Sequence, residues 1–178
     1  MKNSAILIVF AFSFSFFLSL GCYAQAKTYQ ISTDKENGAK VLKGLLTRAD
    51  IDTDTSFKWF QQNYQLGHAN EQAVQAFKKN GTKFQIVVFF GTWCDDSQNL
   101  LPVFFRLADK SAYPETNITL IGIERGKMAL NNLRTAFNIT NSPTFIVMKD
   151  GKEIGRVVEY GKYGQIDKEL GEIVSSIP

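Results

Sequence analysis

One stretch of the chain, from Phe84 to Leu107, constrains the fold more than any other. Phe84 to Phe90 is apolar and rich in β-branched and aromatic residues, which predicts a buried strand. After a Gly91-Thr92 turn, apolar spacing indicates a helix that begins near Cys94 and carries Leu100, Leu101, Val103, Phe104 and Leu107. The backbone N–H groups and the dipole at a helix N-terminus favour a thiolate. The sequence therefore predicts a strand, a turn and a helix that together present a reactive cysteine.

The segments that follow complete an α/β pattern. Strands are predicted at residues 118–123, 144–148 and 153–159, and helices at 127–137 and 165–175. Asp150-Gly151 is the strongest hairpin signal in the chain. The resulting order, β-α-β-α-β-β-α, requires parallel strands joined by crossover helices, and the hairpin adds antiparallel strands.

The segment before residue 82 is less regular. Residues 27–54 are polar and mixed, and predict a short strand or a loop. A helix is predicted from Thr55 to Gly67, with its aromatic residues packed against the sheet: Trp59, Phe60 and Tyr64. A second helix is predicted from Asn70, as its cap, to Gly81. Residues 27–81 and 82–178 are expected to form one domain.

The first residues indicate export. Lys2 supplies positive charge, residues 5–20 are almost wholly apolar, and no acid occurs before Asp34. This order is typical of a secretory signal peptide, here residues 1–26. The alternative is a retained membrane anchor, for which the apolar stretch is short against the about 20 residues of a spanning helix.

Two cleavage sites remain open. Ala24-Gln25-Ala26 has the small-x-small form that signal peptidase cleaves, whereas Ser19-Leu20-Gly21-Cys22 resembles an imperfect bacterial lipobox, in which Cys22 would be acylated. Ordinary cleavage is favoured. Either outcome predicts the cell envelope, as a periplasmic protein or an outer-membrane lipoprotein, or secretion. The protein would contact the membrane only through a lipid attached to Cys22.

Charge and cysteine content limit the function further. The net charge is +3, and loss of residues 1–26 would remove Lys2 and no acid, so nothing indicates a nucleic-acid partner. The chain has two cysteines, Cys22 and Cys94. The exported protein would therefore keep one free thiol, and no internal disulfide could form.

The motifs, taken together, resemble the thioredoxin-like superfamily. Trp93-Cys94 with Ser97, then Ser142-Pro143-Thr144, then Lys149-Asp150-Gly151 follow the thioredoxin pattern from about residue 82 to the end. Residues 91–97 and 151–156 are similar to exported Bacteroidetes-type proteins with a monothiol Trp-Cys-x-Asp-Ser motif. The resemblance implies a thioredoxin-like α/β fold, a central mixed sheet flanked by helices, here with an N-terminal helical extension.

The resemblance also assigns roles. Cys94 takes the place of the attacking cysteine, and Pro143 that of the cis-proline facing it. Trp93, Ser142 and Pro143 would line a groove for an extended peptide, beside Thr144. Ser97 replaces the second cysteine: it either donates a hydrogen bond to the Cys94 thiolate or caps the helix.

Other positions also depart from the pattern. Val88 stands where thioredoxins bury an acid. Asp95 and Asp96 are expected to stabilise the first turn of the helix. Glu159, at the end of the last strand, would be a proton donor beside the groove, or a partner of Arg125 or Lys127.

Two functions follow. The first is thiol–disulfide exchange through Cys94 alone, with an external thiol completing each cycle on exported proteins that carry disulfides or thiols. The second is a binding module in which Cys94 is dispensable. A peroxide-reacting cysteine is disfavoured, because only Thr92 of the needed Arg and Thr pair is adjacent. Neither cofactor nor metal is expected, and the protein is expected to be a monomer.

Overall fold

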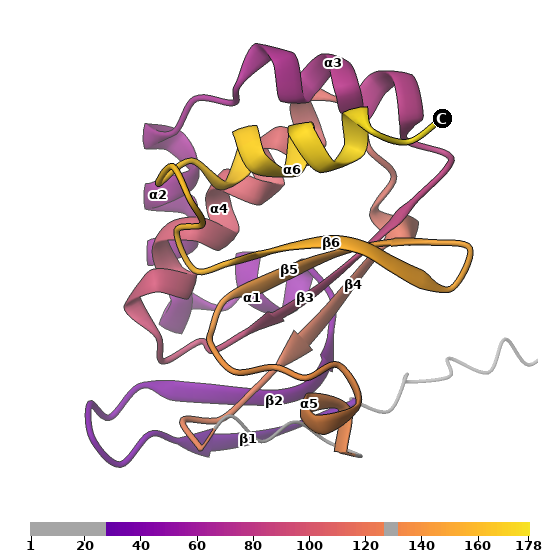
Figure 1. Cartoon of the computed structure of the whole chain (residues 1–178). Helices are drawn as coiled ribbons and strands as arrows, with labels where there is room; N and C mark the ends of the chain where they lie inside the picture. The colour runs from indigo at the N-terminus through magenta and orange to yellow at the C-terminus, as the bar shows by residue number, and fades with distance from the viewer. Residues whose placement is uncertain (1–27, 127–131) are drawn as a thin grey trace, which may run out of the picture.

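A six-stranded mixed sheet forms the centre of the molecule (Figure 1). The computed structural model describes residues 28–126 and 132–178. The strand order is β1-β2-β4-β3-β5-β6, and β3 and β4 alone pair in parallel; the other neighbours are antiparallel. The strands are β1 (Tyr29–Thr33), β2 (Lys40–Leu46), β3 (Gln85–Phe90), β4 (Ile118–Gly122), β5 (Thr144–Lys149) and β6 (Lys152–Val158).

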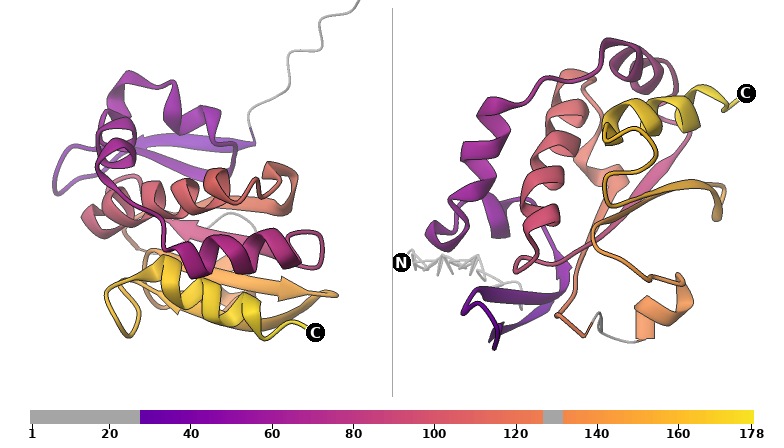
Figure 2. Two further views of the ribbon diagram at one scale, coloured as in Figure 1. Left: turned by 90° about the horizontal axis from the view of Figure 1, so that it is seen from above. Right: turned by 60° about the vertical axis from the view of Figure 1, so that its left-hand side comes forward.

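Helices cover both faces of the sheet, with most on one side (Figure 2). Between β2 and β3 the chain forms α1 (Ala49–Asp52), a 3-10 turn η1 (Thr55–Phe57), α2 (Trp59–Leu66) and α3 (Glu71–Asn80). After β3, the described residues also form the helices α4 (Asp95–Lys110), η2 (Glu115–Asn117), α5 (Leu133–Ala136) and α6 (Ile166–Ser175). No helix in the described part is long and apolar enough to cross a membrane.

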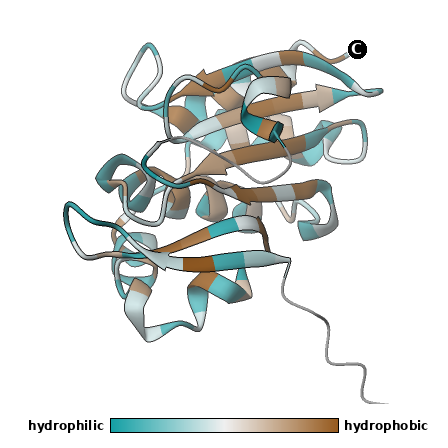
Figure 3. Cartoon of the chain, turned by 90° about the horizontal axis from the view of Figure 1, so that it is seen from below, coloured by the Kyte–Doolittle hydropathy of each residue, from teal (hydrophilic) through white to brown (hydrophobic). Residues whose placement is uncertain are grey.

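The alternation of side chains along β3 divides the core into two layers. Ile86, Val88 and Phe90 face the larger layer, which α2, α3, α4 and α6 complete. Phe89 faces the smaller layer with Ile121 and Ile146. Because side chains on successive strand residues point to opposite faces, a strand buried on both faces is apolar throughout. The middle of the sheet is accordingly hydrophobic over most of its length (Figure 3).

The predicted thioredoxin-like α/β architecture is confirmed. The unit β3-α4-β4 is the parallel crossover, and the predicted hairpin joins β5 to β6. Asp150 has φ +50° and Gly151 φ +74°, the pair of left-handed residues that a tight hairpin turn requires. The helix caps at Asn70 and Gly67 also lie where the sequence predicts them.

The N-terminal segment is more ordered than predicted. Residues 27–54 contain two strands, and β2 pairs with β4, so this segment extends the sheet. The aromatic residues of α2 pack on α4 instead of directly on the sheet; the Phe60 and Phe105 ring centroids lie 5.6 Å apart. Of the helix predicted at 127–137, the structure has α5, and residues 127–131 lie outside the described residues.

A substitution in α2 tests whether residues 28–81 unfold together with the rest. Phe60 is fully buried, so Phe60→Ala should lower the free energy of unfolding by about 3–5 kcal/mol because it leaves a cavity. Leu66→Ala, in the same helix but 79% exposed, is the matched control and should change it by less than about 0.5 kcal/mol. Urea unfolding followed by circular dichroism measures both. A small effect of Phe60→Ala would mean that α2 folds separately.

Candidate functional site

Cys94 lies where β3 ends and α4 begins (Figure 1). It is the N-cap residue of α4, with extended backbone, and its carbonyl oxygen accepts the first helical hydrogen bond, from Gln98 N, at 3.0 Å. The Cys94 side chain accepts no capping hydrogen bond. Cys94 therefore lies at the positive end of the helix dipole, as the sequence predicts.

The turn before β5 contacts the sulfur directly. The Ser142–Pro143 peptide bond is cis, as predicted, and the Cys94 thiol donates a hydrogen bond to the Ser142 carbonyl oxygen at 3.3 Å. The Pro143 carbonyl oxygen accepts from Glu159 N at 2.8 Å, which ties the turn to the end of β6. Cys94 is half-buried, whereas Ser142 and Pro143 are buried. Cys94 is thus more accessible than the two residues of the cis turn.

Ser97 makes neither of the contacts that the sequence suggested. Its side chain is fully buried, and its hydroxyl lies 3.1 Å from the Ser142 hydroxyl. Gly91 N donates to both hydroxyls, at 3.2 Å to Ser97 and 3.0 Å to Ser142. The hydroxyl that replaces the second sulfur therefore joins β3, α4 and the cis turn.

Trp93 is almost buried, at 9% exposure. Its indole N–H donates to the Ile123 carbonyl oxygen at 2.9 Å, and its ring lies against Gly91, where a Cβ would approach the ring to 2.6 Å. Only glycine fits at that position. The predicted groove residue is therefore a fixed wall beside Cys94.

Two other predicted residues have different surroundings from those expected. Thr144 is 1% exposed, and its hydroxyl donates to Asn141 O at 2.7 Å. Glu159 follows β6 with φ +50°, and its carboxylate accepts from the Asn141 side chain at 2.9 Å. The proposed pair with Arg125 is not formed, because Arg125 has other carboxylate partners; Lys127 lies outside the described residues.

The first turn of α4 carries the predicted acids. Asp95 is exposed and Asp96 half-buried, both within the turn where a negative charge stabilises the helix. Val88 is fully buried in the core, where it packs as an apolar residue. The Thr92 hydroxyl donates to Lys40 O and accepts from Leu42 N, so it is engaged with β2. His, Cys, Asp and Glu side chains form no metal-binding group in the described ranges.

Sequence reasoning missed the loop between β1 and β2. The Asn37 side chain donates to Trp93 O at 3.1 Å, and Asp34 accepts from Arg125 Nε at 2.8 Å and Nη2 at 3.0 Å. Arg125 in turn lies over the Trp93 ring, its Cζ 4.5 Å from the centroid. The one signal available was the Asp-Lys-Glu-Asn-Gly run, which is typical of a turn and says nothing of its partner.

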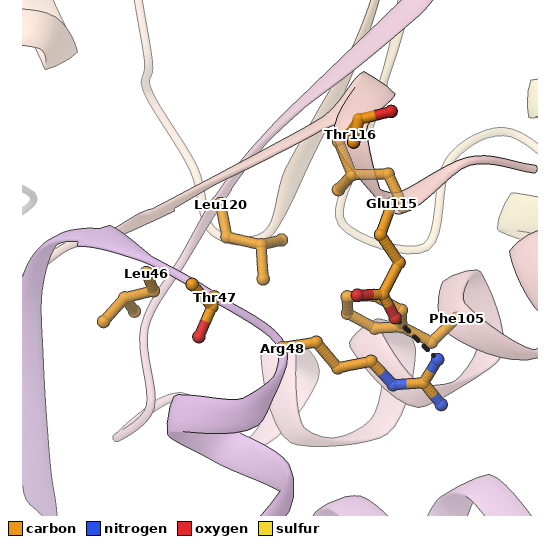
Figure 4. A pocket seen from close by; sticks show the side chains of 8 residues that line it. Leu46, Thr47, Arg48, Phe105, Glu115, Thr116 and Leu120 are labelled. Atoms are coloured by element: carbon orange, nitrogen blue, oxygen red, sulfur yellow. Dashed lines mark hydrogen bonds and ion pairs between the residues drawn. The ribbon is translucent and has the colours of Figure 1, made fainter. Parts of the chain in front are cut away.

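A separate hollow of about 260 Å³ lies at the opposite end of β4, where Ile118 and Leu120 line it (Figure 4). Arg48 projects along it, with its guanidinium 4.8 Å from the Phe105 ring centroid. That guanidinium already donates to Asp109 at 2.8 Å and to Glu115 at 3.3 Å. The Arg48 guanidinium thus pairs with two carboxylates and also contacts the Phe60 and Tyr64 rings, so the arrangement supports the packing of α2 on α4.

The family model for thioredoxin matches residues 66–172, from the end of α2 through most of α6. The chain belongs to the thioredoxin family. Membership implies a general capability for thiol–disulfide redox chemistry, and it fits a sulfur at the start of a helix that faces a cis-proline turn. Residues 28–65, with the β1–β2 hairpin, lie outside the matched segment.

Several thioredoxins are similar to the chain. It is 36% identical over 87 residues to thioredoxin-like protein R548 of Acanthamoeba polyphaga mimivirus, over 49% of this chain and 60% of that protein. It is 26% identical over 95 residues to thioredoxin H2 of Arabidopsis thaliana, over 53% of this chain and 66% of that protein. The match thus spans under two thirds of these relatives. A poplar thioredoxin h structure aligns with a TM-score of 0.41 and 21% identity, over 60% and 89% of the two chains.

The Asp34–Arg125 pair should make stability depend on pH. The hydrogen bond from Arg125 lowers the pKa of Asp34 from 3.8 to about 2. A lowered folded-state pKa contributes stability that is complete above about pH 4 and is lost as the pH falls toward about 2. We therefore expect Asp34→Asn to be less stable than the natural protein at neutral pH, with the difference narrowing in that window.

Urea unfolding of the two proteins across this pH range measures the difference. Asp150→Asn, a carboxylate lost from an exposed turn, controls for the change in net charge. A difference for Asp34→Asn that stays constant down to the acid limit would contradict the ion pair.

Proposed function

We propose that the protein is an exported thioredoxin that carries out thiol–disulfide exchange through Cys94 alone, with an external thiol completing each cycle. The observation that carries the proposal is the position of Ser97. It stands where a resolving cysteine would, one helical turn after Cys94, and its hydroxyl is buried between Gly91 N and the Ser142 hydroxyl. A hydroxyl there can neither attack a disulfide nor form one.

The proposed cycle has two exchange steps. The Cys94 thiolate attacks one sulfur of a partner disulfide, a bond forms between the two sulfurs, and the other partner sulfur leaves as a thiolate that takes a proton from water. An external thiolate then attacks the partner's sulfur in the mixed disulfide, and Cys94 leaves as a thiolate. The Ser142 carbonyl oxygen, 3.3 Å from the sulfur, accepts a hydrogen bond from the resting thiol.

The second candidate is a binding module in which the sulfur does no chemistry. It is favoured by the same hydrogen bond, since the thiol is half-buried and engaged as a neutral donor. Cysteines with a structural role are inert when their thiols are withheld from reaction, and this hydrogen bond would withhold the Cys94 thiol. The two candidates differ in whether Cys94 reacts in the folded protein.

The proposal places the protein outside the cytoplasm. Residues 1–26, which lie outside the described residues, would direct export from the cytoplasm of a Bacteroidetes-type bacterium. The mature chain would act in the cell envelope on exported proteins that carry disulfides or thiols. Intact mass of the protein purified from its host tests this. Cleavage before Lys27 or acylation at Cys22 is expected, and a mass that retains residues 1–20 would contradict both.

Ser97→Cys tests the monothiol cycle. A second sulfur at position 97 can attack a mixed disulfide on Cys94, so the pre-reduced variant, with no small thiol added, should complete the reduction of about one insulin disulfide per molecule and become oxidised itself, whereas the pre-reduced natural protein should stop at the mixed disulfide. The variant should also trap fewer partners as mixed disulfides. Cys94→Ala should abolish exchange in both backgrounds.

Ser97→Ala is the matched control, because it removes the same two hydrogen bonds without adding a sulfur. It should not raise turnover. Release of fully reduced insulin by the pre-reduced natural protein, with no small thiol added, would overturn the monothiol mechanism. A Cys94→Ala protein that keeps its partners and its cellular role would favour the binding module.

A further inference from the structure

Arg125 places a positive charge beside the turn that carries Cys94. Its guanidinium lies over the Trp93 ring, with Cζ 4.5 Å from the centroid, and Trp93 directly precedes Cys94. The ring cannot move aside, because its N–H is bonded to Ile123 O and its other face meets Gly91. A cation held over a fixed ring is itself fixed in place.

Asp34 holds the guanidinium from the other side. It accepts two parallel hydrogen bonds from Arg125, at 2.8 and 3.0 Å, and two more from the backbone of its own loop, Glu36 N and Asn37 N, both at 3.0 Å. Asp34 is 6% exposed. Such a bidentate pair fixes geometry as well as charge. The pKa of Asp34, about 2, keeps the carboxylate charged wherever thiol exchange proceeds.

The loop that carries Asp34 also contacts the Cys94 turn itself. Asn37 donates to Trp93 O at 3.1 Å, and Thr92 donates to Lys40 O at 2.8 Å. Both residues before the cysteine are thus anchored to the hairpin, which lies outside the segment that matches the family model.

The charges around the sulfur are mixed. The pKa of Arg125 is raised, first by the hydrogen bond with Asp34 and also by attraction to Glu36 and to Cys94. The guanidinium lies over the ring of Trp93, the residue before Cys94. Asp95 and Asp96 add negative charge from the first turn of α4. Arg125 is therefore a cation in an otherwise acidic setting.

We infer that Arg125 is a positioning residue for Cys94: held by Asp34 of the β1–β2 loop, it fixes Trp93 and supplies positive charge at the reacting sulfur. The inference rests on the proposed use of Cys94 as the reacting group. In this arrangement the β1–β2 hairpin contributes to the reactivity of Cys94. The inference also implies that sulfur reagents bearing an anionic group react faster than they would without Arg125.

Alkylation by two reagents tests the charge separately from the packing. Iodoacetamide is neutral and iodoacetate is anionic, and both form a carbon–sulfur bond at Cys94 with loss of iodide. The ratio of their rate constants at one pH cancels any change in access or in thiolate fraction. We expect Arg125→Gln to lower the iodoacetate-to-iodoacetamide ratio about two- to fivefold, as loss of one nearby charge in water predicts.

Arg125→Lys should restore much of the ratio, because it keeps the positive charge. Arg106→Gln is the matched control: Arg106 also lies 4.5 Å from an aromatic centroid, that of Tyr64. It lies about 18 Å along α4 from Cys94, beyond the screening length at about 0.1 M salt. Its loss should leave the ratio unchanged.

An unchanged ratio in Arg125→Gln would overturn the inference. If both rate constants fell equally, Arg125 would have only a packing role. The alkylation ratio does not depend on turnover. A protein that shows no exchange with insulin but shows the change in the ratio would contradict the proposed cycle and would still support the positioning role of Arg125. A native Cys94 that neither reagent modifies would overturn both.

Discussion

The site depends on the two hydrogen bonds that the backbone N–H of Gly91 donates. This N–H lies where β3 ends, and it donates to two buried hydroxyls that belong to different parts of the chain, Ser97 in α4 and Ser142 in the cis turn. The two hydroxyls also contact each other. Because each group is buried and each has a partner, the loss of one member would leave the others unsatisfied. Strand, helix and turn therefore keep one arrangement around the sulfur.

The same arrangement gives Ser97 a structural role. Its side chain is fully buried, and its hydroxyl contacts both Gly91 N and the Ser142 hydroxyl. A sulfur would fill this polar position less well, since a thiol is a weak hydrogen-bond partner. The hydroxyl at position 97 therefore supports the fold whatever it does for the chemistry of Cys94.

The sequence predicted those parts of the fold that depend on local pattern. The run from Phe84 to Phe90 could only be a buried strand, the helical spacing after Cys94 could only cover it, and Asp150-Gly151 could only turn a hairpin. Tertiary hydrogen bonds carry no such pattern. The bond between Arg125 and Asp34 joins residues 91 apart, and nothing in their spacing selects that pair over Arg125 and Glu159. The direction of the Ser97 hydroxyl is likewise set by the cis turn, 45 residues later.

The β1–β2 hairpin, whose loop contacts the site, also forms one edge of the sheet. β1 has a neighbour on one side only, and Ile31 in that strand is 53% exposed. Edge elements with few buried contacts open locally at a smaller free-energy cost than the core, and they do so while the rest stays folded. Such an opening would separate Asp34 from Arg125 and release the turn before Cys94, yet leave β3 and α4 intact. Warming would therefore loosen the surroundings of the sulfur well below the temperature at which the protein melts.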